Sequence, residues 1–414
     1  MNIQSFVLNS PRGPDGLKMT AKRYRPTGAR GRHGEETIHR GDGRTLTLLL
    51  AHCVGSHKEQ WEPTIEHLFQ LERENPGADT KASSIIREAW SIDWQNHGDG
   101  AVVNRKTLQS PERAPGVSLY EWADALSDLA VKLATGEMDG ERHKLVAIGH
   151  SAGATAFTLS AHTLLPSLFY PLTDQPFAKR MHPYSALILT EPTLVTHKTF
   201  HITEQEHEAR MDEMRFAVGM TKKRKWKWRS WTEARRYFGL PQNGEAGDGQ
   251  DGRLPWAMWD QEVVRRLVEY GLESDNDSSA KTGDDSSITE ERRDGPVRLK
   301  CHPEQEAASY PNTAPHHEGA EYLADIVKAQ VPVHLVWGTR CDLVPEFIQD
   351  SLSDASEGRN VASVTKMEDA GHMVVQEQPK ELAVALMKIL QTVFTDETED
   401  WRRRTLTSTI TTKL

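Results

Sequence analysis

A serine between two glycines is the first group in this sequence whose residue types and spacing could do chemistry. Residues 149–153 read Gly-His-Ser-Ala-Gly, and the apolar run before them (144–149) predicts a strand. Glycines on both sides of Ser151 permit the strained backbone of a sharp strand-to-helix turn. A helix beginning at Ala152 would present unpaired N–H groups to a developing oxyanion. The spacing predicts Ser151 as a nucleophile, and the alternative is a serine that only caps the helix.

A nucleophilic serine needs a histidine base that is oriented by a carboxylate. His372 lies between the last predicted strand and the last predicted helix, so it would emerge at the carboxyl edge of a parallel sheet. Asp342 and Glu191 each follow a predicted strand and would reach the same edge. We predict His372 as the base and Asp342 as the acid, with Glu191 as the alternative acid.

The loop after the third predicted strand reads His-Cys-Val-Gly-Ser-His-Lys-Glu over 52–59. A second oxyanion donor is expected from such a loop, and we assign it to the backbone N–H of Val54, paired with that of Ala152. Cys53 is expected to be a small packed residue, because Ser151 already occupies the sharp turn.

Metal and cofactor chemistry is not indicated by the sequence. His143, His316 and His317 show no ligand spacing with nearby cysteines or carboxylates. We therefore predict no metal site, and the predicted chemistry requires no organic cofactor.

The elements that must position these residues alternate between strands and helices, which is typical of βαβ units and a mostly parallel sheet. We predict an α/β fold in which helices cover both faces of the central sheet. The predicted strands are 3–8, 17–24, 45–51, 85–93, 144–149, 185–190, 331–337 and 361–367, and the predicted helices are 59–72, 119–136, one from about 152, and 379–394.

The alternation is interrupted by a stretch that reads as helices 203–219, 231–238 and 260–272, joined by glycine-rich and acidic, serine-rich loops. This stretch is predicted to be a helical lid inserted into the core, and a polar, frayed tail is expected from Thr395 onward. The predicted division is core 1–193, lid 194–315, core 316–396 and tail 397–414.

Composition narrows the class of protein. The chain has 414 residues and a formal net charge of −10, which argues against bulk attraction to nucleic acid. Its apolar runs fall well short of the roughly 18 residues that a membrane span needs. The first residues lack the pattern of a signal peptide, and three cysteines are too few for a disulfide framework. We expect an intracellular protein that is not secreted.

Taken together, these motifs resemble the α/β-hydrolase superfamily. Three segments (52–63, 92–104 and 299–307) look more narrowly like fungal peroxisomal α/β-hydrolases, a group that includes lipase-like enzymes and proteins of toxin or secondary-metabolite biosynthesis. The resemblance implies a Ser151–His372–Asp342 triad that cleaves a small-molecule carboxylic ester or thioester through an acyl-enzyme. Alternatives are an acyltransferase, and a binding or pathway-accessory protein of the same fold.

Two further segments bear on partners. Six of the eight residues in 222–229 are basic, with tryptophans between and just after them, so 222–231 could contact an anionic membrane surface or pack as part of the lid. The chain ends in Thr412, Lys413 and Leu414, close to the Ser-Lys-Leu signal read by the peroxisomal import receptor. We expect a peroxisomal location, with the cytoplasm as the alternative.

Overall fold

The computed structural model describes residues 1–10, 16–27, 45–74, 84–165, 182–200, 204–240, 255–275 and 295–411. Its main feature is an eight-stranded sheet in the order β1-β2-β4-β3-β5-β6-β10-β11. These strands are β1 (Asn2–Asn9), β2 (Lys18–Arg25), β3 (Leu46–Ala51), β4 (Ile86–Ile92), β5 (Lys144–His150), β6 (Tyr184–Thr190), β10 (Val333–Gly338) and β11 (Ser363–Met367).

The last six strands of that order run parallel, whereas β1 and β2 pair antiparallel at one edge. The prediction of a mostly parallel central sheet is therefore confirmed. Parallel strands all end at the same edge of the sheet, so the loops that follow β3, β5, β6, β10 and β11 gather there.

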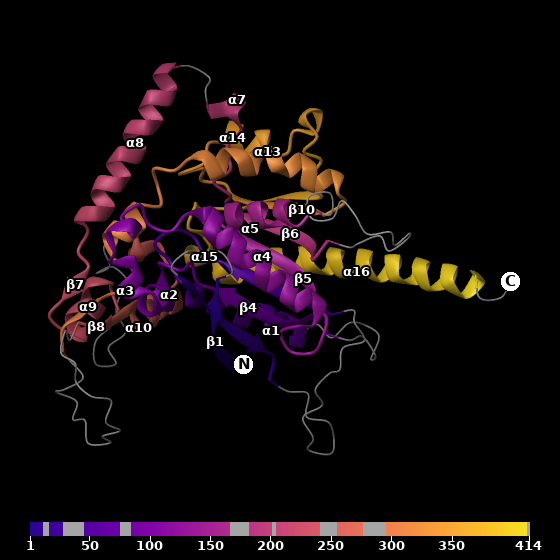
Figure 1. Cartoon of the computed structure of the whole chain (residues 1–414), viewed down its shortest axis with the longest axis horizontal. Helices are drawn as coiled ribbons and strands as arrows, with labels where there is room; N and C mark the ends of the chain where they lie inside the picture. Colours follow the sequence, from indigo (N-terminus) through magenta and orange to yellow (C-terminus); the bar gives the residue numbers. More distant parts are fainter. Residues whose placement is uncertain are drawn as a thin grey trace, which may run out of the picture.

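Helices cover both faces of the sheet (Figure 1). One face packs against α4 (Leu119–Thr135), α5 (Ala152–Thr163) and α13 (Ala314–Lys328), and the other packs against α1 (Glu62–Glu74) and α16 (Pro379–Thr411). Strand β3 shows why both faces are apolar: Leu48 and Leu50 belong to one buried cluster, and Leu49 and Ala51 belong to the other. Successive side chains of a strand point to opposite faces, so a strand buried on both sides reads as a continuous apolar run.

Shorter helices fill the remaining connections of the core. They are η1 (Lys58–Trp61), α2 (Gly98–Val103), α3 (Arg105–Leu108), η2 (Pro111–Arg113), α14 (Glu346–Ser351), η4 (Ala355–Glu357) and α15 (Val374–Glu377). Helix α4 is delimited by local signals, because Ser118 forms a capping box with Glu121 and Gly136 ends the helix in a left-handed conformation.

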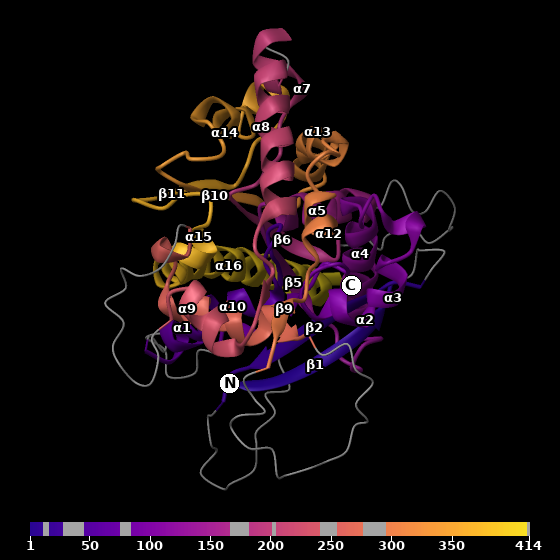
Figure 2. The ribbon, with the colours of Figure 1, turned by 90° about the vertical axis from the view of Figure 1, so that its left-hand side faces the viewer.

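The chain between β6 and α13 forms a separate layer beside the carboxyl edge (Figure 2). It contains α7 (His197–Phe200), α8 (Glu204–Lys223), β7 (Lys227–Trp228), α9 (Trp231–Tyr237), η3 (Trp256–Met258), α10 (Gln261–Gly271), β8 (Leu272–Ser274), β9 (Val297–Leu299) and α12 (Pro303–Ala307). Three of its helices lie close to the predicted ones, while the three-stranded sheet β7-β9-β8 was not predicted. This layer has its own apolar cluster, which includes Trp228, Phe238 and Val264.

The C-terminal segment is more regular than predicted, and several predicted loops lie outside the described residues. The sequence predicts an irregular tail from Thr395, but α16 continues to Thr411. The glycine- and arginine-rich stretch 28–44, most of the two low-complexity loops of the predicted lid, and the final residues Thr412, Lys413 and Leu414 lie outside the described residues.

Candidate active site

Ser151 lies on the sharp turn between β5 and α5. Its backbone angles are φ 54° and ψ −115°, a conformation that residues other than glycine seldom adopt. A Cβ atom on Gly149 would lie 2.4 Å from the Cα atom of Ala154. A Cβ atom on Gly153 would lie 2.4 Å from the carbonyl oxygen of Ala51. The two glycines are thus what allows the chain to turn this closely against its neighbours.

The imidazole of His372 lies between the serine and a carboxylate. Its Nε2 atom is 3.0 Å from Ser151 Oγ, and its Nδ1 atom is 3.1 Å from Glu191 Oε2. An ionised carboxylate can only accept a hydrogen bond, so Nδ1 carries the proton and Nε2 is left to accept from the serine hydroxyl. This tautomer is the one that a general base requires.

Glu191 is fixed by both of its carboxylate oxygens. It follows β6 with a positive φ of 47°, and its side chain is only 3% exposed. Besides the contact of Oε2 with His372, Oε1 accepts from the backbone N–H of Gly338 at 2.5 Å. The carboxylate therefore has little freedom to leave the imidazole.

Asp342, the acid preferred from the sequence, occupies a different place. Its Oδ1 accepts from the backbone N–H of His372 at 2.7 Å, and its Oδ2 lies 3.2 Å from Arg340 Nη2. Its side chain is 44% exposed. The expected contact between Asp342 and the imidazole is thus wrong in this structure, where the position belongs to Glu191. Asp342 instead holds the backbone of the loop that carries His372.

His150 is a member of the site that the sequence analysis missed. It is fully buried, and its Nε2 atom donates to the carbonyl oxygen of His372 at 2.7 Å. Burial lowers the pKa of His150 to about 3, so the imidazole stays neutral. Together with the Asp342 carboxylate, it fixes the peptide groups on both sides of the His372 side chain. Its only signal in the sequence is its position directly before Ser151.

The two expected oxyanion donors, Val54 and Ala152, follow the adjacent strands β3 and β5. Ala51 and Gly149 are paired in the parallel register of β3 and β5, so the loop that contains Val54 emerges beside the serine turn. Ala152 is the first residue of α5, where backbone N–H groups have no partner within the helix. Cys53 is 2% exposed, and burial raises the pKa of its thiol to about 12, which keeps it protonated.

Among the described residues, Glu88, Asp139 and His143 bring potential metal-ligating atoms within 4.8 Å of one another. These atoms already have protein partners. Glu88 pairs with Arg25 at 2.7 Å, and His143 contacts both Asp139 and Thr47. The polar atoms of this cluster therefore satisfy one another and their neighbours. The four-residue spacing of Asp139 and His143 is visible in the sequence, but Glu88 comes from the distant strand β4, so the cluster of three could not be predicted.

Comparison with known proteins identifies the family. Residues 48–385, well over half of the chain, match the sequence profile of the α/β-hydrolase family. The chain belongs to this family. A segment of 156 residues, or 37% of the chain, is 31% identical to the peroxisomal membrane protein LPX1 of Saccharomyces cerevisiae. That match spans 32% of the relative's length.

Solved structures of other α/β-hydrolases are similar to this one. The peroxisomal α/β-hydrolase Lpx1 of Saccharomyces cerevisiae has a TM-score of 0.61 at 18% identity, covering 100% of this chain and 98% of that one. The thioesterase domain from the curacin biosynthetic pathway has a TM-score of 0.52 at 14% identity, with coverages of 95% and 100%. Such identities show a shared fold. None of the helices described here is long and apolar enough to cross a membrane.

Proposed function

We propose that this α/β-hydrolase cleaves a small-molecule carboxylic ester or thioester through a Ser151–His372–Glu191 triad. The observation that carries the proposal is the continuous chain of contacts from Ser151 Oγ through both ring nitrogens of His372 to the buried Glu191 carboxylate. A serine placed on a strained turn and paired with a base of the correct tautomer is the arrangement that acyl transfer requires.

In the proposed reaction, Ser151 Oγ attacks the carbonyl carbon while His372 Nε2 takes the hydroxyl proton. Glu191 stabilises the imidazolium, and the amides of Val54 and Ala152 hold the oxyanion of the tetrahedral intermediate. Collapse of the intermediate releases the alcohol or thiol, which receives the proton from His372. A water molecule, deprotonated by the same imidazole, then attacks the acyl-enzyme, and the second collapse releases the acid and restores the serine.

Two other outcomes share the same site. In an acyltransferase, a second hydroxyl would replace water in the deacylation step. In a binding or accessory protein, the pocket would be kept with little turnover. We prefer hydrolysis because water can accept the acyl group with no protein groups beyond those already named. An acyltransferase would also need a site that binds the second hydroxyl compound.

Covalent labelling tests the proposal. Purified protein is treated with a fluorophosphonate probe beside Ser151→Ala, and p-nitrophenyl butyrate and an acyl-coenzyme A are then offered as ester and thioester substrates. We expect labelling of the wild type alone, and repeated turnover of at least one substrate. Labelling without turnover would favour the accessory role, and a folded wild type that is not labelled would contradict an activated serine.

We also propose that the protein works in the peroxisome, at a lipid surface, in fungal lipid or secondary-metabolite metabolism. The location is supported by the similarity to LPX1 and by the final residues Thr412, Lys413 and Leu414. Surface contact is supported by Phe216 and Met220, which lie one turn apart on α8 and are 70% and 54% exposed. A fluorescent fusion that keeps the native C-terminus free should appear in peroxisomes, and a diffuse signal would contradict the location.

A further inference from the structure

Three sequence segments that carry no proposed catalytic side chain converge around the loop of Val54. They are 52–63, 92–104 and 299–307, and the last belongs to the lid layer. The loop begins at His52, whose Nε2 atom accepts from the backbone N–H of Trp94 at 3.1 Å. It ends at Lys58, whose backbone N–H donates to Asp93 Oδ1 at 2.8 Å. Both ends of the loop are thus anchored on the segment that follows β4.

The middle of the loop is anchored by a third contact from the same segment. The backbone N–H of Gly55, the residue after Val54, donates to His97 Nε2 at 3.1 Å. An amide N–H can only donate, so His97 Nε2 is unprotonated and its Nδ1 carries the proton. Nδ1 then donates to Asn96 Oδ1 at 2.7 Å. The Asn96 amide donates in turn to the backbone carbonyl of Gln305 on α12, at 3.3 Å.

Helix α12 of the lid also touches Gly55 directly. Glu306 is 3% exposed, and its Oε1 atom would lie 2.9 Å from a Cβ atom on Gly55, so the carboxylate fills the space that the missing side chain leaves. The carboxylate is paired with Arg224, the residue after α8, whose Nη1 donates to Oε1 at 2.7 Å. Gln305 is held as well, because its amide donates to the carbonyl oxygen of Arg113 at 2.9 Å.

From these contacts we propose that His97 is a positioning residue for the oxyanion hole, and that lid helix α12 sets it through Asn96. The Gln305 carbonyl fixes the orientation of the Asn96 amide, and Asn96 Oδ1 fixes the tautomer of His97. His97 Nε2 then holds the Gly55 peptide, and with it the preceding amide of Val54. The inference rests on the proposed hydrolytic function and names how the lid takes part in it.

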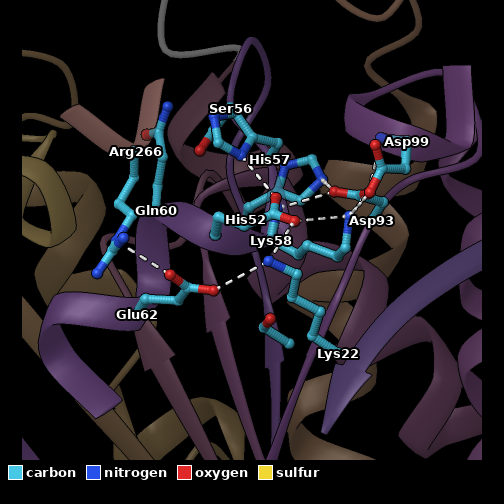
Figure 3. A network of polar contacts seen from close by, with 12 residues as sticks. Lys22, His52, Ser56, His57, Lys58, Gln60, Glu62, Asp93, Asp99 and Arg266 are labelled. Atoms are coloured by element: carbon cyan, nitrogen blue, oxygen red, sulfur yellow. Dashed lines mark hydrogen bonds and ion pairs between the residues drawn. The ribbon is translucent and has the colours of Figure 1, made fainter. Parts of the chain in front are cut away.

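A layer of buried charges makes the rest of this region rigid (Figure 3). Lys58 Nζ lies 2.7 Å from both Asp93 Oδ2 and Asp99 Oδ2, and its side chain is 1% exposed. Arg266 of lid helix α10 reaches Glu62 at 3.0 Å. This ion pair joins α10 of the lid layer to the core. The position of α12 relative to the Val54 loop therefore depends on this contact as well as on the contacts of α12 itself.

The proposed anchor works only while His97 is neutral. Burial lowers the pKa of His97 well below its ordinary value, and the neighbouring groups His52, Arg224 and His57 act in the same direction. The ring also stacks on Trp94, with centroids 5.2 Å apart. A protonated His97 would turn two donors, Nε2–H and the Gly55 N–H, toward each other and displace the loop.

The test compares His97→Leu, His97→Gln and Asn96→Asp with wild type, using p-nitrophenyl butyrate hydrolysis. His97→Leu removes the acceptor, and a displaced oxyanion donor should lower kcat roughly 10- to 100-fold while KM changes little. His97→Gln keeps an acceptor oxygen and should recover most of this loss. Asn96→Asp places a carboxylate at Nδ1–H, which raises the pKa of His97, and it also removes the N–H that donates to the Gln305 carbonyl. The acid limb of the kcat–pH profile should therefore move to higher pH, and kcat at pH 8 should fall as well, because the contact with α12 is lost.

If His97 had a purely structural role, kcat should fall by a similar factor at every pH, and His97→Gln should not recover it. That result would overturn the inference. The tautomer is measured separately by ¹⁵N NMR of histidine-labelled Ser151→Ala protein. Protonation of His97 at Nε2 would contradict the proposed chain of hydrogen bonds from Gln305 through Asn96 and His97 to Gly55, even if the enzyme were active. A wild type that shows the expected tautomer but neither fluorophosphonate labelling nor turnover would instead refute the proposed function. The contacts of His97 would then have no catalytic role.

Discussion

Glu191 Oε2 lies 3.1 Å from His372 Nδ1, although 181 positions of sequence separate the two residues. Glu191 follows β6, and His372 follows β11, two strands further along the sheet. The strand between them, β10, leads to Asp342, which reaches only the backbone N–H of His372. One carboxylate thus meets the imidazole and the other meets the peptide group of the same residue.

This division of roles predicts opposite results for two matched variants. Glu191→Gln keeps the size of the side chain but removes the charge that fixes and stabilises the imidazole, so kcat should fall about 10³- to 10⁴-fold. Asp342→Asn keeps an oxygen that can accept from the His372 amide, so the loss should be less than about 10-fold. Steady-state hydrolysis of p-nitrophenyl butyrate by both variants shows which carboxylate supports the imidazole in catalysis. Near-normal activity in Glu191→Gln with a large loss in Asp342→Asn would restore Asp342 as the acid.

The glycine after the serine turn gives a second prediction. Gly153→Ala would place a Cβ atom 2.4 Å from the carbonyl oxygen of Ala51, and the backbone there cannot yield without disturbing β3. We expect a loss of about 1–3 kcal/mol in the free energy of unfolding and a large loss of fluorophosphonate labelling. Gly219→Ala is the control, because no atom lies within 4 Å of its added Cβ atom on α8. That change should stabilise the helix by roughly 0.5–1 kcal/mol, and equal effects at both sites would contradict the steric argument.

The sequence was sufficient to predict the sheet and the serine turn because both depend on local patterns. Strand β3 is buried at each of its six positions and apolar at five of them, and the two glycines around Ser151 lie at the end of an apolar strand and just beyond it. The acid could not be chosen in this way. Glu191 and Asp342 each follow a strand, those strands are neighbours, and the choice depends on where each side chain points. The positive φ of Glu191 helps to set that direction, and no sequence pattern announces it.

The small sheet β7-β9-β8 was missed for a different reason. Strand β7 has two residues, and β8 and β9 have three each, which is too short for an alternating pattern to be visible. Its strand β7 lies within the basic stretch 222–231, so part of that stretch is structural. Trp228 is buried in the apolar cluster of the layer between β6 and α13, while Lys225 and Lys227 pair with Glu233 and Asp275. The charge run alone could not show which lysines have partners.

The exposed part of that region predicts binding to anionic lipid. Lys222 and Lys223 are exposed and follow Phe216 and Met220 on α8, so charge and apolar surface lie together. Wild type should sediment with vesicles that contain phosphatidylserine, and less with phosphatidylcholine alone. Changing both lysines to glutamate should weaken binding about tenfold or more, and Phe216→Ser with Met220→Ser should weaken it at any salt concentration. Val364→Ser serves as the control, since Val364 is 45% exposed on edge strand β11. Equal binding by all variants would rule out this surface.

The buried charges around Lys58, next to the Val54 loop, should make the free energy of unfolding depend on pH. Burial alone would raise the pKa of Glu59, but the charges of Lys58 and Lys22 and the hydrogen bond from His57 hold it well below the ordinary value of 4.5. A carboxylate whose pKa is lower in the folded protein stabilises it above the unfolded pKa, and this contribution is lost as pH falls through the folded pKa. The free energy of unfolding, measured by urea denaturation, should therefore decrease from pH 5.5 downward.

Removing the cation at the centre of these buried charges tests the cause. Lys58→Met leaves Asp93 and Glu59 buried without their shared partner, which should cost about 3–5 kcal/mol at pH 7. Because the Glu59 carboxylate then lacks its largest stabilising charge, it is protonated more easily, and the loss relative to wild type should shrink as the pH is lowered toward 4. Lys132→Met is the matched control, since its i,i+4 pair with Asp128 on α4 is partly exposed and worth less than about 0.5 kcal/mol. A Lys58→Met protein whose deficit is the same at pH 7 and pH 4 would show that lost packing, and not the uncompensated carboxylates, is responsible.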